Sequence, residues 1–246
     1  MGLKKEDYLI LKKVANKNNY SLDELIKVYG KESSFGINLN RKGSSFHGPF
    51  QFGKDAIKDL KDEGYNFTLD DAKGNLQKSA EAYIILTNLN RKKYNRALEQ
   101  FNVSSSGRKI INNLGESVKN YLIHQQGAQG LAAIAKSIES GTYSSERWFW
   151  KEGENLNIKG TGRQVIKGSD LRKKMLANLT DSQKTFFKDS TQTPSEASEY
   201  FLNSVKTQLD YIDYESDIKS YEKEINKKDD TSFLFPDDRV MNEALG

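Results

Sequence analysis

The chain of 246 residues contains no cysteine, which excludes disulfide bonds and thiol chemistry. Its 2 histidines, His47 and His124, belong neither to a His-Glu-x-x-His pattern nor to a ligand cluster with the spacing that a zinc site requires. Gly160-Thr161-Gly162 lacks the other glycines of a dinucleotide-binding loop. We therefore expect no metal and no other cofactor.

Long apolar runs are also missing. The N-terminal residues 1–7 lack the apolar region of a secretory signal peptide, and no stretch approaches the roughly 18 consecutive apolar residues of a membrane span. We expect no signal peptide, no transmembrane segment and no stable insertion into a membrane. An extracellular substrate would then have to be reached by cell lysis or from inside a virus particle.

Neither sign of charge dominates, because 38 basic and 34 acidic residues give a net charge of +4 and are spread along the chain. A nucleic-acid binder would show a basic stripe interleaved with aromatic residues, so we expect no nucleic-acid partner. Weak attraction to polyanions remains, and bacterial cell-wall polymers are one such class.

Helical periodicity prevails over strand-like alternation, so the predicted fold is mainly α. The length suits one domain, predicted over residues 1–212, with a charged C-terminal helix and tail over 213–246. Residues 36–52 predict loops or a short hairpin, and 141–170 an irregular segment. The main predicted helices span 77–98, 115–126, 128–140 and 194–212.

Glu32 is an isolated acid, since no other acidic residue follows it before Asp55. Ser21-Leu22-Asp23-Glu24 predicts a capping box that opens a helix, and Gly30 is expected to end that helix just before Glu32. The negative end of the helix dipole and the apolar Phe35 would both raise the pKa of Glu32. A glycan-cleaving acid catalyst requires such a raised pKa.

Four short motifs follow one another along the chain: Glu32-Ser33-Ser34-Phe35, Gly48-Pro49-Phe50-Gln51, Ala80-Glu81-Ala82-Tyr83 and Tyr121-Leu122-Ile123-His124-Gln125-Gln126-Gly127-Ala128. In order and approximate spacing they resemble those of the lysozyme-like lytic transglycosylases, most closely the phage-encoded members. The resemblance covers roughly residues 20–140. It implies a lysozyme-like fold with a small loop or hairpin region after the catalytic Glu.

The resemblance also implies an activity, the cleavage of the β-1,4 bond between N-acetylmuramic acid and N-acetylglucosamine in peptidoglycan. Glu32 would be the single catalytic acid, and attack by the C6 hydroxyl of the sugar would leave a 1,6-anhydro end. The residues expected to bind the glycan strand are Ser33, Phe50, Gln51, Tyr83, Tyr121, His124, Gln125 and Gln126. The acid-free segment after Glu32 independently favours a mechanism without a second carboxylate.

Two alternatives stay open. If a distant acid such as Asp70 or Asp71 folds into the cleft, the enzyme would be a hydrolytic muramidase. The chain could instead be an inactive lysozyme-like protein of a virion or a cell-wall-binding protein, because fold does not imply function. The expected location is a phage virion, or the host cytoplasm before the protein reaches the cell wall, and the C-terminal tail could contact other virion proteins.

Overall fold

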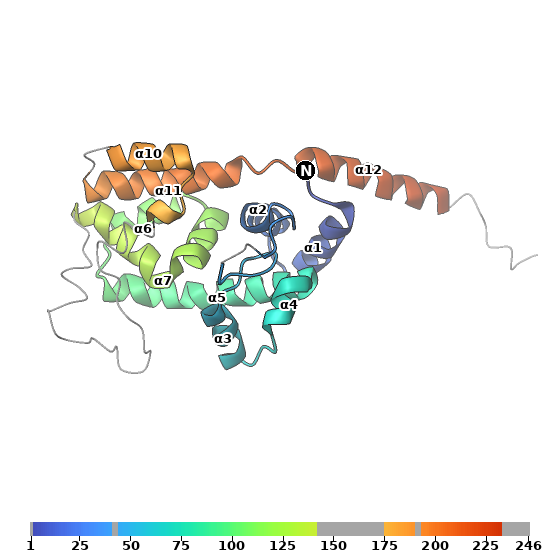
Figure 1. Cartoon of the computed structure of the whole chain (residues 1–246), viewed down its shortest axis with the longest axis horizontal. Helices are drawn as coiled ribbons and strands as arrows, with labels where there is room; N and C mark the ends of the chain where they lie inside the picture. Colours follow the sequence, from blue (N-terminus) through green and yellow to red (C-terminus); the bar gives the residue numbers. More distant parts are fainter. Residues whose placement is uncertain (1, 41–43, 142–174, 190–192, 233–246) are drawn as a thin grey trace, which may run out of the picture.

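The computed structural model describes residues 2–40, 44–141, 175–189 and 193–232, and in these the protein is mainly α-helical, as predicted (Figure 1). Apart from Gly141, the irregular segment predicted over 141–170 lies outside the described residues. In chain order the helices are α1 (Lys5–Lys17), α2 (Leu22–Ser33), α3 (Lys54–Asp62), α4 (Leu69–Gly74), α5 (Leu76–Gln100), α6 (Ser105–Asn112), α7 (Glu116–Ser140), α10 (Asp181–Asp189), α11 (Pro194–Asp210) and α12 (Glu215–Ser232).

Two helices of 25 residues each, α5 and α7, form the centre of the molecule. The backbone of α7 breaks at Gly127, whose φ of 74° and ψ of 161° are not helical. This break confirms the separate helices predicted over 115–126 and 128–140. In Figure 1, α7 lies between α5 on one side and α11 on the other, and it contacts both.

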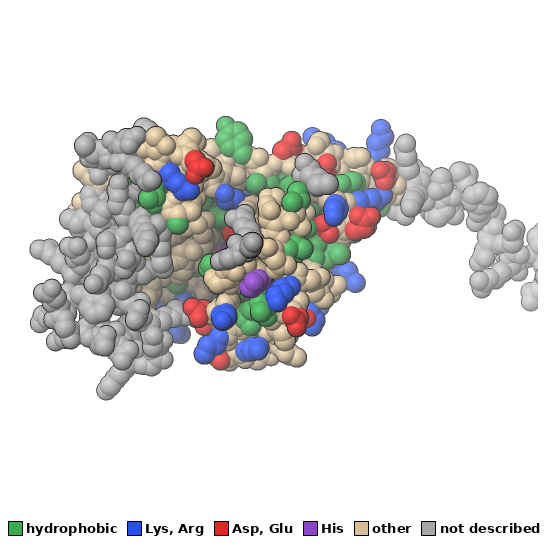
Figure 2. Space-filling model, in the orientation of Figure 1, with side chains coloured by type: hydrophobic (Ala, Val, Ile, Leu, Met, Phe, Trp, Pro, Cys, Tyr) green, Lys and Arg blue, Asp and Glu red, His purple; other side chains and the backbone are tan. Residues whose placement is uncertain are grey.

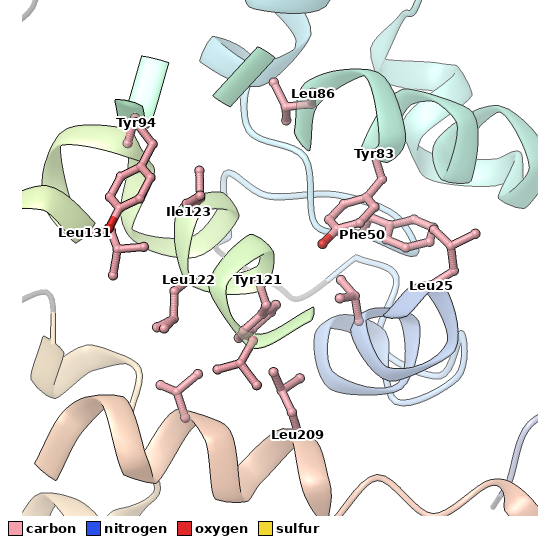
Figure 3. Close-up of a cluster of buried hydrophobic side chains, with 14 of the residues drawn as sticks. Leu25, Phe50, Tyr83, Leu86, Tyr94, Tyr121, Leu122, Ile123, Leu131 and Leu209 are labelled. Carbon is pink, nitrogen blue, oxygen red and sulfur yellow. The ribbon is translucent and has the colours of Figure 1, made fainter. Parts of the chain in front are cut away.

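Aromatic rings fill the core between α2, α5 and α7. The rings of Phe50 and Tyr83 stack with their centroids 5.1 Å apart, and both side chains are fully buried. Figure 3 shows these two rings beside Leu25 of α2, while Tyr121 points from α7 toward α11. The loop that carries Phe50 is therefore anchored to the helices by its own hydrophobic side chain.

The chain reverses sharply after α2. Three consecutive residues, Ser34, Phe35 and Gly36, have positive φ angles of 52°, 55° and 83°, a conformation that costs energy in residues other than glycine. The turn folds Phe35 back over α2. Residues 36–52, predicted to form loops or a short hairpin, form loops with one isolated antiparallel bridge between His47 and Phe52.

Gly30 does not end α2, contrary to the prediction, because the helix continues to Ser33. Glycine serves close packing here instead. A Cβ atom at Gly30 would lie 2.7 Å from Cγ2 of Ile212 and 2.8 Å from Cζ of Phe35. Glu32 consequently belongs to the last helical turn rather than to the loop.

The C-terminal helix α12 packs against the first helix α1. The backbone N–H of Leu3 donates to Asp217 Oδ2 at 2.9 Å, and Tyr8 Oη donates to Glu222 Oε1 at 2.8 Å. The far end of α12 extends beyond the other helices (Figure 1). None of the helices in the described part of the chain is both long and apolar enough to cross a membrane.

Candidate functional site

A pocket of about 1340 Å³ brings together segments that are far apart in the sequence. Its walls come from the end of α2, the loop before α3, the middle of α5 and both halves of α7. Residues 177–180, Lys184 and Gln208 of α11 complete the lining. Of the predicted site residues, the pocket lining contains Glu32, Gln51, Tyr121, His124, Gln125 and Gln126.

Glu32 is partly exposed and lines the pocket from the last turn of α2. The carbonyl groups that end a helix carry a partial negative charge, which favours the neutral form of a nearby carboxyl group. The positive φ angles that follow Glu32 turn the backbone away immediately. The raised pKa expected for Glu32 stays a prediction.

The fourth motif places its polar side chains along one hydrogen-bonded row. Gln126 Nε2 donates to Gln125 Oε1 at 3.3 Å, and Gln125 Nε2 donates to Tyr121 Oη at 3.1 Å. Gly127 and the three residues after it also line the pocket. The break at Gly127 therefore directs the start of a new helical segment toward the pocket.

His124 faces the pocket as a neutral imidazole. Burial lowers its pKa to about 4, and its Nε2 lies 3.1 Å from the carbonyl oxygen of Phe50. A carbonyl oxygen only accepts hydrogen bonds, so Nε2 carries the proton and Nδ1 is the acceptor. His124 thus offers a ligand a hydrogen-bond acceptor rather than a positive charge.

Gln51 lines the pocket but also holds the loop in place. Its Nε2 donates to the carbonyl oxygens of Gly48 at 2.7 Å and Asn38 at 3.2 Å. Gln51 itself has a positive φ of 48°. These bonds join two distant parts of the loop and offset the cost of that backbone conformation.

Ser33, Phe50 and Tyr83 are fully buried and do not line the pocket, which contradicts the prediction that they contact a substrate directly. Ser33 Oγ donates to the carbonyl oxygen of Tyr29 at 2.9 Å. The ring of Tyr83 lies edge-on to His124 with centroids 5.2 Å apart, and Phe50 accepts the His124 hydrogen bond. These three motif residues lie near the pocket, but they are packed behind the residues that line it.

Behind the pocket lies a buried acid, Glu24, which the sequence predicted only as part of a capping box. Glu24 is 3% exposed; its Oε1 accepts from Tyr20 and from Tyr83 Oη, and its Oε2 from Asn120 Nδ2 at 2.9 Å. Arg91 Nε donates to Asn120 Oδ1 at 2.7 Å. Burial raises the pKa of Glu24, and these hydrogen bonds oppose the rise.

Other carboxylates also belong to the pocket. Asp55 and Asp59 line it with Glu32, whereas Asp70 and Asp71, the acids considered from the sequence, do not. Asp71 instead caps α4. Basic residues share the lining, and Figure 2 shows basic and acidic side chains interspersed on the visible face. Within the described ranges, no cluster of three or more His, Cys, Asp or Glu side chains is placed to hold a metal ion.

Several residues that line the pocket were not among those predicted from the sequence. Phe46 is 52% exposed at the pocket and packs on Gly53, where a Cβ atom would lie 3.0 Å from the ring. Polar residues of the C-terminal half complete one wall: Asn178, Thr180, Lys184 and Gln208. No local motif marks these positions, because only the packing of α11 on α7 brings them to the pocket.

Comparisons with known proteins add nothing to this geometry: no family model matches the chain, and searches of curated proteins and of solved structures find no similar protein.

Proposed function

We propose that this protein is a peptidoglycan lytic transglycosylase with a lysozyme-like fold. The observation that carries the proposal is the convergence of Glu32 with Tyr121, His124 and Gln125 on one pocket, although about 90 residues separate them in the sequence. An acid that can donate a proton, beside hydrogen-bonding side chains that can hold a sugar, suits acid-catalysed cleavage of a glycan. The pocket is large enough for sugar units of a glycan strand.

In the proposed reaction, the protonated Glu32 donates its proton to the oxygen that links N-acetylmuramic acid to N-acetylglucosamine. The bond from that oxygen to C1 breaks as positive charge develops on the muramyl ring. The ionised Glu32 then removes the proton from the C6 hydroxyl, whose oxygen bonds to C1. The products are a free 4-hydroxyl group and a 1,6-anhydro end, and Glu32 is protonated again. Water is not consumed.

The bonded row of Tyr121, Gln125 and Gln126 would orient the glycan, since its amide and hydroxyl groups can exchange hydrogen bonds with sugar hydroxyls. The neutral His124 would accept a further hydrogen bond without adding a positive charge near the developing cation. The glycan strand of peptidoglycan is thus the proposed partner. A phage virion or lysin is the proposed setting, on the strength of the motifs alone.

A hydrolytic muramidase is the second candidate, favoured by one observation. Asp55 and Asp59 line the same pocket as Glu32, so the acid-free segment of the sequence does not leave the pocket free of other acids. Asp59 Oδ2 lies 2.7 Å from Lys93 Nζ. A hydrolase would use one of the two to activate water or to attack C1.

The test is digestion of purified peptidoglycan, with the new chain ends identified by mass spectrometry. Wild type is expected to yield 1,6-anhydro ends, and Glu32→Gln is expected to yield none. Glu63→Gln, at an exposed acid outside the pocket lining, is the matched control and should retain activity. Asp55→Asn and Asp59→Asn should also retain activity under the transglycosylase mechanism.

The other outcomes identify the alternatives. Reducing ends from the wild type, abolished by Asp55→Asn or Asp59→Asn, would establish the muramidase. Binding to peptidoglycan without any new ends would favour an inactive cell-wall-binding protein. Full activity of Glu32→Gln would remove Glu32 from the mechanism.

A further inference from the structure

Glu24 of α2 carries a buried carboxyl group that the proposed reaction does not use. Its side chain accepts hydrogen bonds from Tyr83 on α5 and from Asn120 on α7. Burying a charged carboxylate costs free energy, and a well-packed apolar side chain is often no less stabilising at such a position. Packing alone therefore does not account for an acid here.

The surroundings of Glu24 suit its ionised form. Asn120 presents its Nδ2 to Glu24 Oε2, because its own Oδ1 accepts from Arg91 Nε at 2.7 Å. Glu24 Oε1 accepts from the hydroxyl groups of Tyr20 and Tyr83. A proton on either carboxyl oxygen would compete with one of these donors. The donors and the positive charge of Arg91 oppose the rise in the pKa of Glu24 that burial causes.

Glu24 and Glu32 lie on the same helix, about two turns apart. Eight residues of an α-helix span about 12 Å along the axis. Between them on α2, Val28 and Tyr29 are 1% and 3% exposed, so buried side chains occupy this part of the helix. An effective dielectric constant of about 20 applies to such surroundings, well below that of water. A negative charge on Glu24 therefore disfavours a second negative charge on Glu32.

We propose that the carboxylate of Glu24 helps to keep Glu32 protonated in the pocket. The inference rests on the proposed function, because a proton donor must hold its proton until the glycan binds. Glu24 does not line the pocket, so it acts as a positioning residue. Its charge, and not its shape, favours the proton on Glu32.

Other charged groups surround the two acids and remain in place when Glu24 is changed. His124 in the pocket is neutral, since burial lowers its pKa to about 4. The charged groups are Asp7 of α1, Asp23, Lys27 and Lys31 of α2, Arg91 of α5, Glu116 of α7, and the pocket residues Lys54, Asp55, Lys58, Asp59 and Lys184.

The test is a titration of the side-chain carboxyl carbons by nuclear magnetic resonance, in the full chain labelled with carbon-13 in glutamate. Spectra of Glu24→Gln and Glu32→Gln assign the two signals by their loss. In Glu24→Gln the titration midpoint of Glu32 should fall by about one pH unit, the shift expected for a charge about 12 Å away at that dielectric constant. In wild type, the Glu24 signal should be that of the ionised form at the pH where Glu32 titrates.

Asp23→Asn is the matched control, because it removes the same charge from the neighbouring position of α2. The Asp23 side chain is 48% exposed, and its Oδ2 lies 3.1 Å from Lys27 Nζ. Water and salt screen such a charge, so the Glu32 midpoint should move by a few tenths of a pH unit at most. Glu24→Asp keeps the charge while it disturbs the packing, and should keep the midpoint near that of wild type.

Glu24→Met is a second charge-free variant for the case that Glu24→Gln does not fold, and thermal unfolding verifies each variant. An unchanged Glu32 midpoint in the charge-free variant would overturn the inference. So would an equal fall in Glu24→Asp or Asp23→Asn, or a wild-type Glu24 signal of the protonated acid while Glu32 titrates. These readings require no cleavage. Failure of the proposed function would appear separately, as wild type that releases no new chain ends from peptidoglycan.

Discussion

Asn120 Nδ2 donates a hydrogen bond to Glu24 Oε2 at 2.9 Å and so ties α7 to α2 inside the core. Glu32 lies eight residues after Glu24 on α2, and His124 lies four residues after Asn120 on α7. The bond therefore joins two helices that both supply residues to the pocket. Residues 96 positions apart are held at hydrogen-bond distance before any substrate arrives.

Asn120→Ala should lower the free energy of unfolding by about 1–3 kcal/mol, because Glu24 stays buried with one donor fewer. The hydrogen bond from Asn120 lowers the pKa of Glu24, so its loss raises that pKa further. A raised folded pKa favours the protonated acid, and the destabilisation relative to wild type should therefore grow as the pH rises through the folded pKa of Glu24, which burial holds above its usual value. Urea unfolding between pH 4 and pH 8 measures it.

The control is Asn203→Ala, at an exposed position of α11, which should change stability little at any pH. A loss for Asn120→Ala that is the same at every pH would show that Glu24 does not titrate in response to this bond.

Gly127→Ala should cost both stability and activity. The φ of 74° and ψ of 161° at Gly127 lie in a region that only glycine occupies readily, so alanine costs about 1–3 kcal/mol or straightens α7. Straightening would move the first turn after Gly127 out of the pocket. Urea unfolding and the release of soluble peptidoglycan fragments measure the two effects.

Gly115 offers a matched comparison, because its φ of 86° and ψ of 159° are nearly the same and it is outside the pocket lining. A Cβ atom would meet nothing within 4 Å at either glycine, so both substitutions act through the backbone alone. Gly115→Ala should lose similar stability and keep its activity. Equal activity of the two variants would mean that the break does not shape the site.

Two capping sequences show what could be predicted from the sequence and what could not. Thr193 and Glu196 form both hydrogen bonds of a capping box at the start of α11, where the sequence predicts a helix from residue 194. At α2, Ser21 accepts from the Glu24 backbone as predicted, but the Glu24 side chain turns inward to Tyr83 and Asn120. The helix start is a local property, whereas the direction of the side chain depends on partners from α5 and α7.

The same distinction applies to the site. Glu32 and the polar row on α7 could be predicted because their spacing follows helical periodicity and a known motif order. Phe50 and Tyr83 belong to the same motifs, but their burial results from mutual stacking that the motifs do not encode. Gln208 reaches the pocket only because α11 packs on α7, and no local sequence pattern predicts that contact.

His124 should make stability depend on pH. Its folded pKa of about 4 lies below the usual value of 6.5, so the folded protein binds fewer protons between these values than the unfolded chain does. Stability present above pH 6.5 should be lost as the pH falls toward 4, by on the order of 2 kcal/mol from this group, since partial exposure reduces the effect. His124→Gln should remove this component.

The free energy of unfolding by urea, measured at several pH values for wild type and His124→Gln, tests this prediction. Parallel curves for His124→Gln and wild type would show that the imidazole does not titrate in this range. The resonance of the His124 ring gives an independent reading by nuclear magnetic resonance, and with 2 histidines in the chain its assignment is simple.

Phe46 should act as a stacking platform for a sugar ring at the edge of the pocket, because its half-exposed ring is held against Gly53. Phe46→Ala should raise KM for peptidoglycan fragments by about threefold to tenfold and change kcat little, since a stacking contact at the edge contributes to binding rather than to bond cleavage. Phe46→Trp should restore KM. Steady-state rates on soluble fragments provide the measurement.

Tyr211→Ala is the control for Phe46, because Tyr211 is 82% exposed and does not line the pocket. It should leave both constants unchanged. A fall in kcat without a change in KM for Phe46→Ala would contradict the stacking role and indicate that Phe46 shapes the catalytic geometry.

The contact between α1 and α12 also restricts when the protein can finish folding during synthesis. Leu3 and Tyr8 are made before the groups that bind them, because Asp217 and Glu222 follow more than 200 residues later. Contacts so distant in sequence form late, so the outer face of the first helix stays uncovered until nearly all of the described chain has emerged.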